Sequence, residues 1–135
     1  MFRTRVYYQD TDAGGVVYFA NYLKLFEKSW FEFLSSIGIL LPEWEKQGTF
    51  LLVKKVLLDL LDKSRYGDEL EAHTSVSDVK NAQITFTHAI LKNGKTITCG
   101  ETLMVCVDIT GKPKRIPEDF KKRLLACQKR SATTI

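Results

Sequence analysis

The chain has 135 residues, 44% of them hydrophobic and 27% charged, which is typical of a globular protein and excludes a disordered chain. Its 20 lysines and arginines outnumber its 16 acidic residues, but the excess lies at one end. Residues 112–130 contain eight basic and two acidic residues, and the remainder of the chain has a net charge of −2. Because the basic residues do not spread over the whole chain, the sequence argues against nucleic acid as a partner.

The sequence also limits the compartment and the metals. No apolar run approaches the roughly 20 residues that span a bilayer, so we expect no membrane span. Cys99, Cys106 and Cys127 are odd in number and lack the paired spacing of disulfide or zinc ligands. With only His73 and His88 besides, we expect no metal site, and we interpret the cysteines as reduced thiols of a cytoplasmic protein.

The first half of the chain predicts a strand, a loop and a long helix. Residues 2–9 alternate apolar and polar side chains as a strand does, and residues 10–15 are rich in turn formers. Over residues 18–37 the apolar positions recur every three or four residues up to Gly38, which predicts an amphipathic helix. Residues 42–47 are compatible with a short helical turn.

The second half predicts consecutive strands. Residues 50–61 are rich in leucine and valine and fit a buried strand or a helix equally well. Residues 69–79 alternate clearly, and residues 83–92 and 95–109 flank Asn93-Gly94, which is a strong hairpin signal.

The C-terminal part predicts a terminal helix. Pro117 stands where a proline opens a helix, and the helix is expected over residues 118–129, followed by a loose tail at 131–135. We therefore expect a single domain over residues 1–135, in which residues 118–135 are the terminal helix and tail. The fold class is α+β, with one long central helix packed against a curved antiparallel sheet of about five strands, which is the hotdog arrangement.

The loop before the long helix is the candidate for chemistry. Asp12 lies just ahead of a helix N-terminus, where free N–H groups can stabilise an oxyanion, and such a carboxylate can act as a base or a nucleophile. Gly14 and Gly15 leave the backbone open to a ligand. The residues alone leave a second interpretation open, in which Asp12 only caps the helix or closes an Asx turn.

Residues 7–23 read Tyr-Tyr-Gln-Asp-Thr-Asp-Ala-Gly-Gly-Val-Val-Tyr-Phe-Ala-Asn-Tyr-Leu. This segment resembles the signature of the hotdog acyl-CoA thioesterases of the 4-hydroxybenzoyl-CoA/YbgC type. The resemblance implies an enzyme that hydrolyses acyl-CoA to free acid and CoA, with no cofactor because coenzyme A belongs to the substrate. It implies that Asp12 is the catalytic nucleophile or general base, that the backbone N–H of Phe19 meets the thioester oxygen, and that Tyr8 lines the site.

The sequence departs from the YbgC-type members at Phe19, where they commonly have histidine, whereas hydroxybenzoyl-CoA-type members have an aromatic residue. A backbone donor does not depend on its side chain, so the oxyanion role is retained while histidine-assisted proton transfer is not available. The loop residues expected to contact substrate are Gly14, Gly15, Val16 and Tyr18. The basic residues that could meet the three phosphate groups of CoA are Lys54, Lys55, Arg65, Lys80, Lys112, Lys114 and Arg115, although each of them alone could be a solvated surface residue.

Several alternatives stay open on the sequence. Phe26 and Trp30 either line an acyl pocket or fill the core. The chain could be a non-catalytic protein of the same fold that binds acyl-CoA or an acyl carrier protein. A single helix leaves sheet edges unprotected, so we expect a homo-oligomer, either a dimer with sites at its interface or a tetramer. The acyl group itself is not predicted.

Overall fold

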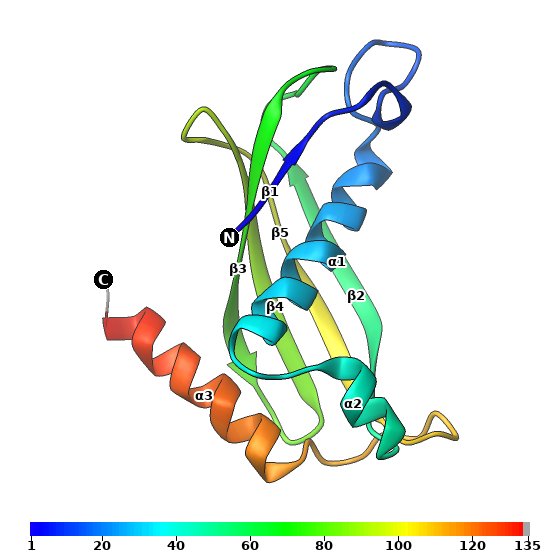
Figure 1. Ribbon diagram of the computed structural model, residues 1–135, viewed down its shortest axis with the longest axis vertical. Coiled ribbons are helices and arrows are strands. Elements are labelled where there is room, and N and C mark those ends of the chain that lie inside the picture. Colours follow the sequence, from blue (N-terminus) through cyan, green and yellow to red (C-terminus); the bar gives the residue numbers. More distant parts are fainter. Residues whose placement is uncertain (134–135) are drawn as a thin grey trace.

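The computed structural model describes residues 1–133. It contains one antiparallel sheet of five strands in the order β1-β3-β4-β5-β2, crossed on one face by a long helix (Figure 1). The strands are β1 (Phe2–Arg5), β2 (Phe50–Leu60), β3 (Glu69–Val79), β4 (Gln83–Lys92) and β5 (Lys95–Val107). The helices are α1 (Phe19–Ser36), α2 (Leu41–Lys46) and α3 (Glu118–Thr133), with a 3-10 turn η1 (Tyr8–Asp10). The predicted α+β hotdog arrangement is confirmed.

The first strand is shorter than the predicted range of residues 2–9. β1 ends at Arg5, and η1 follows. The carboxylate of Asp10 accepts a hydrogen bond from the backbone N–H of Tyr7 at 2.8 Å, and the N–H of Asp10 donates to the carbonyl of Tyr7 at 2.9 Å. These short-range bonds replace strand pairing and turn the chain toward the loop that contains Asp12.

The ambiguous segment at residues 50–61 forms the edge strand β2. It pairs with β5 from Phe50 opposite Val107 to Leu60 opposite Thr98, and the register shifts between Val53 and Lys55. A bulge of this kind interrupts the alternation of the strand, so its apolar residues do not follow a simple two-residue period.

The core lies between the sheet and the helices α1 and α3. Phe26 and Leu34 of α1 are buried, as are Phe120 and Leu124 of α3. Helix α3 continues to Thr133, beyond the predicted end at residue 129 and into the expected tail, whose residues 134–135 lie outside the described residues. Strand β5 ends at residue 107, two residues earlier than predicted.

A chain of buried polar side chains joins α1 to the sheet. The imidazole of His88 lies 2.8 Å from the hydroxyls of both Thr74 and Thr102, and Thr74 bonds to Ser29 of α1 at 2.6 Å. The ring of Phe26 stacks on His88 with 4.4 Å between centroids. Phe26 and His88 therefore belong to the core, which for Phe26 is one of the two expected roles, and burial lowers the pKa of His88 to about 4.

Candidate active site

The loop between η1 and α1 is held closed by backbone hydrogen bonds. The N–H of Tyr18 donates to the carbonyl of Asp10 at 2.9 Å, and the N–H of Asp12 donates to the carbonyl of Val16 at 2.9 Å. The N–H of Val17 donates to the carbonyl of Ser64 in the β2–β3 connection, also at 2.9 Å. The loop is thus anchored to both neighbouring segments, and the backbone of Asp12 is held against Val16, three residues before α1 begins.

Within this loop the Asp12 carboxylate is oriented by the backbone. Its Oδ1 accepts the N–H of Gly14 at 2.8 Å, which closes the Asx turn that the sequence left open. A Cβ at position 14 would lie 3.2 Å from the same Oδ1, and Gly15 has a φ of 79° that favours glycine. The two glycines therefore give the loop its shape and keep it open around the carboxylate.

Helix α1 begins at the end of this loop with unsatisfied donors. Tyr18 is the N-cap and its side chain makes no capping bond, while the N–H of Asn21 donates back to the carbonyl of Tyr18 at 2.8 Å. The N–H groups of Phe19 and Ala20 stand in the first turn, where a helix offers no acceptor. Among the described residues neither group has a backbone acceptor from elsewhere. The site thus contains a fixed carboxylate and two free N–H donors.

Aromatic side chains gather around this loop. Six aromatic residues are exposed in the described part of the chain, and five of them lie here: Tyr7, Tyr8, Tyr18, Phe19 and Tyr66. Tyr18 and Phe19 pack with 4.9 Å between centroids, and Tyr8 and Tyr66 meet edge to face at 6.0 Å. The sequence reasoning missed Tyr66. Its signal was an aromatic residue followed by Gly67 in a turn, where a core residue is not expected.

The predicted basic residues separate into three groups. Arg65 belongs to the site. Its backbone forms an isolated antiparallel β-bridge with Val16, and its guanidinium lies 3.9 Å from the position that a Cβ on Gly15 would occupy. Lys54 and Lys55 are exposed midway along the β2 edge.

The remaining candidates lie at the opposite end of the sheet, where β2 begins (Figure 1). They are Lys80, Lys112, Lys114 and Arg115. Lys114 donates there to the hydroxyl of Thr49 at 2.8 Å. One copy of the chain therefore does not bring these four to Asp12.

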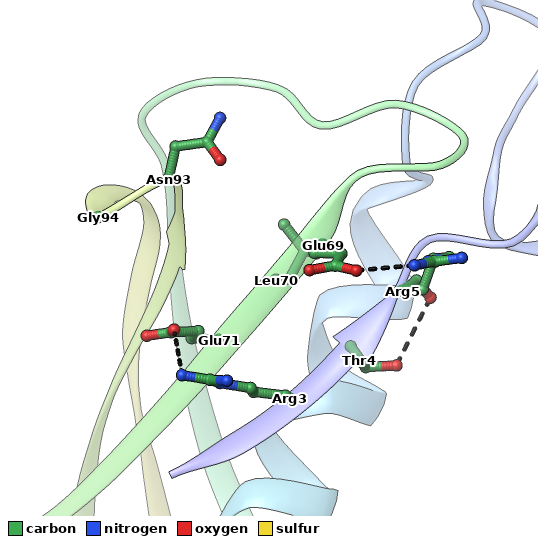
Figure 2. Close-up of a pocket in the computed structure, with 8 residues that line it drawn as sticks. All are labelled: Arg3, Thr4, Arg5, Glu69, Leu70, Glu71, Asn93 and Gly94. Atoms are coloured by element: carbon green, nitrogen blue, oxygen red, sulfur yellow. Dashed lines mark hydrogen bonds and ion pairs between the residues drawn. The ribbon is translucent and has the colours of Figure 1, made fainter.

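A surface depression is separate from this site. It has a volume of about 550 Å³ and lies between β1, β3 and the β4–β5 hairpin (Figure 2). Figure 2 shows Arg3 directed at Glu71 and Arg5 directed at Glu69, with N–O distances of 3.3 and 2.7 Å. Since its charges neutralise one another and it holds no nucleophile or base that is free of such a pair, we do not assign chemistry to it.

A smaller cavity of about 170 Å³ lies behind the loop, between β1, η1 and α1. Its lining includes Tyr7, Asp10, Lys24 and Lys28, but not Asp12. The Asp12 loop itself is an open surface in one copy of the chain.

Comparison with known proteins agrees with this fold and motif. The family model of the thioesterase-like superfamily matches residues 6–124. The acyl-CoA thioesterase YbgC of Haemophilus influenzae is 36% identical over 122 residues, covering 89% of this chain and 90% of that protein. The acyl-CoA thioester hydrolase YbgC of Escherichia coli O6:H1 is 33% identical over 118 residues, covering 86% and 88% respectively.

The sheet and helices also superimpose on a solved structure. The DHNA-CoA thioesterase of Staphylococcus aureus aligns with a TM-score of 0.92 over 99% of this chain and 93% of that one, at 23% identity. Such a likeness supports the fold. The match of the family model over residues 6–124 shows that the chain belongs to the thioesterase-like superfamily. No helix in the described residues is long and apolar enough to cross a membrane.

Proposed function

We propose that this protein is an acyl-CoA thioesterase that hydrolyses acyl-CoA to free acid and CoA, with Asp12 as nucleophile or general base. The observation that carries the proposal is the fixed Asp12 carboxylate in the loop that leads directly into the free N–H groups at the start of α1. The names of relatives at 33–36% identity over most of the chain support the same substrate class.

The chemistry needs only these groups. The N–H of Phe19 donates a hydrogen bond to the thioester carbonyl and stabilises the negative charge that develops on its oxygen. Asp12 either attacks the carbonyl carbon, which expels CoA thiolate and leaves a mixed anhydride for water to cleave, or removes a proton from the water that attacks. Both routes give one carboxylic acid and one CoA, and no cofactor enters either route.

The exposed edge strand β2 supports a second copy of the chain as a partner. The long edge strand β2 carries five exposed apolar side chains, and a sixth follows it directly: Leu52, Val53, Val56, Leu57 and Leu60, then Leu61. An exposed apolar edge of this length favours pairing with another strand. In a two-fold pair, β2 of each copy runs antiparallel to the other, so the start of one strand faces the end of its mate.

This pairing would complete the phosphate site. Within one chain, the basic turn at residues 112–115 lies one β2 length from the Asp12 loop, roughly 36 Å for 11 residues at ~3.3 Å each. In the pair, the basic turn of the second copy comes to the end of β2 that carries the Asp12 loop. We therefore propose a homodimer with sites at its interface, and the association of two dimers into a tetramer remains a prediction from the sequence.

The three cysteines support a reducing compartment. Cys99, Cys106 and Cys127 are all free thiols, and Cys106 is buried with its pKa raised by burial. Free buried thiols are usual in cytosolic proteins, and we propose the cytoplasm as the location.

A panel of acyl-CoAs tests the proposal. The purified protein is incubated with acetyl-, butyryl-, octanoyl- and benzoyl-CoA, and released CoA is measured with a thiol reagent. We expect hydrolysis of at least one of them, abolished when Asp12 is replaced. Measurable binding of the panel without hydrolysis would instead make the chain a non-catalytic acyl-CoA binding protein.

A further inference from the structure

The exposed aromatic pair beside the loop is not explained by the fold. Tyr8 is 79% exposed and Tyr66 is 65% exposed, although tyrosine rings are normally largely covered. They touch each other edge to face at 6.0 Å with an interplanar angle of 80°. Two large rings held in water are available to stack with another flat group.

Positive charge accompanies the pair. Arg65 is adjacent to Tyr66 in sequence, and its guanidinium extends over Gly15 of the Asp12 loop. The acids of this connection are already engaged: Asp62 lies 3.5 Å from Lys95, and Asp68 lies 3.6 Å from Lys92.

The side chains of Arg65 and Lys63, by contrast, have no acidic partner among the described residues. Both are exposed. They are therefore available to an anion, and Arg65 directly precedes Tyr66 in the chain.

A flat aromatic ring linked to phosphate groups is the chemistry of a nucleotide. We propose that Tyr8 and Tyr66 stack with the adenine of CoA while Arg65 and Lys63 meet its phosphates, so that the carrier of the acyl group is CoA and not an acyl carrier protein. This rests on the proposed thioesterase function, and it adds a nucleotide subsite to the Asp12 site. Base–aromatic stacking and arginine contacts to phosphate are both strong enough to select the carrier.

The exposure of the pair distinguishes this assignment from an acyl pocket. A pocket for an acyl chain must enclose apolar carbon, and sites of that kind bury most of their ligand. In a single copy of the chain the two rings are 79% and 65% exposed and form no such enclosure, which suits the nucleotide, the most hydrophilic part of the substrate.

The test compares two substrates that carry the same acyl group. One is acyl-CoA and the other is the acyl thioester of N-acetylcysteamine, which lacks the nucleotide. For Tyr66→Ala, we expect the ratio of kcat/KM between the two substrates to fall about tenfold, a size that base stacking supports. Tyr66→Phe, which keeps the ring, should restore the ratio. Tyr7→Ala is the matched control, because Tyr7 is 58% exposed nearby but is not part of the pair.

The outcomes separate the subsite from the thioesterase function. If Tyr66→Ala lowers both substrates equally, or leaves both unchanged, hydrolysis stands and the nucleotide subsite is wrong. Faster hydrolysis of an acyl-carrier-protein thioester than of acyl-CoA would also overturn it. If no thioester is hydrolysed, the proposed function fails, and titration with adenosine 3′,5′-bisphosphate still tests the nucleotide subsite. Binding that weakens about tenfold in Tyr66→Ala supports the subsite. No binding by the unaltered protein refutes it.

Discussion

The Oδ1 of Asp12 accepts the backbone N–H of Gly14 at 2.8 Å. This one bond orients the carboxylate, and its Oδ2 has no hydrogen-bond partner among the described residues. An Asx turn and a reactive carboxylate are thus not exclusive, because one oxygen serves the loop while the other stays free for the substrate. The interpretation of Asp12 as a turn residue is correct, and its catalytic role stays a prediction that is compatible with the turn.

The side chain of Phe19 is expected to affect binding more than chemistry. The residue is 51% exposed and offers its N–H to the thioester whatever its side chain is. We expect Phe19→Ala to raise KM or change acyl preference by about tenfold while kcat stays within about threefold. Steady-state kinetics on two acyl-CoAs of different length would check this. A fall in kcat as large as that of an Asp12 variant would instead assign a chemical role to the ring.

Pairing of β2 edges predicts a dimer that one charge disrupts. Leu57 is 47% exposed in the middle of the edge, so Leu57→Lys places two like charges near each other across a two-fold axis. We expect sedimentation to show monomers and activity to fall at least tenfold. Leu40→Lys, at a position 50% exposed before α2, should leave the assembly intact. A monomeric unaltered protein with full activity would contradict the interface.

His88 makes the stability of the fold depend on pH. Its pKa is about 4 in the folded protein and about 6.5 when unfolded, so the unfolded state binds the proton more readily. The free energy of unfolding should therefore be fully present above pH 6.5 and decrease by roughly 3 kcal/mol as the pH falls to about 4. Urea unfolding between pH 4 and 7 measures this slope. His88→Gln should flatten it, and an unchanged slope in that variant would assign the pH dependence elsewhere.

Gly100 is required by the packing of α1 on the sheet. A Cβ there would meet the carbonyl of Leu57 and lie 2.8 Å from the ring of Phe26, which stacks on His88. Gly100→Ala should lower the free energy of unfolding by about 2 kcal/mol or more, because a backbone carbonyl cannot move aside. Thermal melting would show the loss, and Cys99→Ala on the adjacent residue should change the melting temperature little. Equal melting of the two variants would mean that the sheet yields more readily than this packing implies.

Periodicity predicted the long helix α1, the strands β3 and β4 and the Asn93-Gly94 hairpin, because each depends on local patterns. The bulge near Lys54 broke the alternation of β2, and only its pairing with β5 identified that segment as a strand. Likewise, β1 ends early because the side chain of Asp10 accepts a hydrogen bond from the backbone of Tyr7, and residue propensities do not predict such a bond.

The candidate site divides in the same way. Asp12, Gly14 and Phe19 are close in sequence, so the motif alone located them. The placement of the basic residues depends on how distant segments meet, and the sequence therefore could not separate Arg65, beside the loop, from Lys114, at the far end of β2. Tyr66 escaped notice because its partner Tyr8 is distant in the chain.

Replacement of Asp12 by asparagine tests the proposed reaction most directly. Asparagine keeps the size of the side chain and can still accept the N–H of Gly14, so the loop should hold its shape and the melting temperature should stay nearly constant. Asp10→Asn is the matched control, since the carboxylate of Asp10 bonds only to the backbone of Tyr7. We predict that Asp12→Asn lowers kcat/KM for the best acyl-CoA at least 100-fold while Asp10→Asn changes it little. Near-normal hydrolysis by a folded Asp12→Asn protein would contradict the assignment of Asp12 as nucleophile or base.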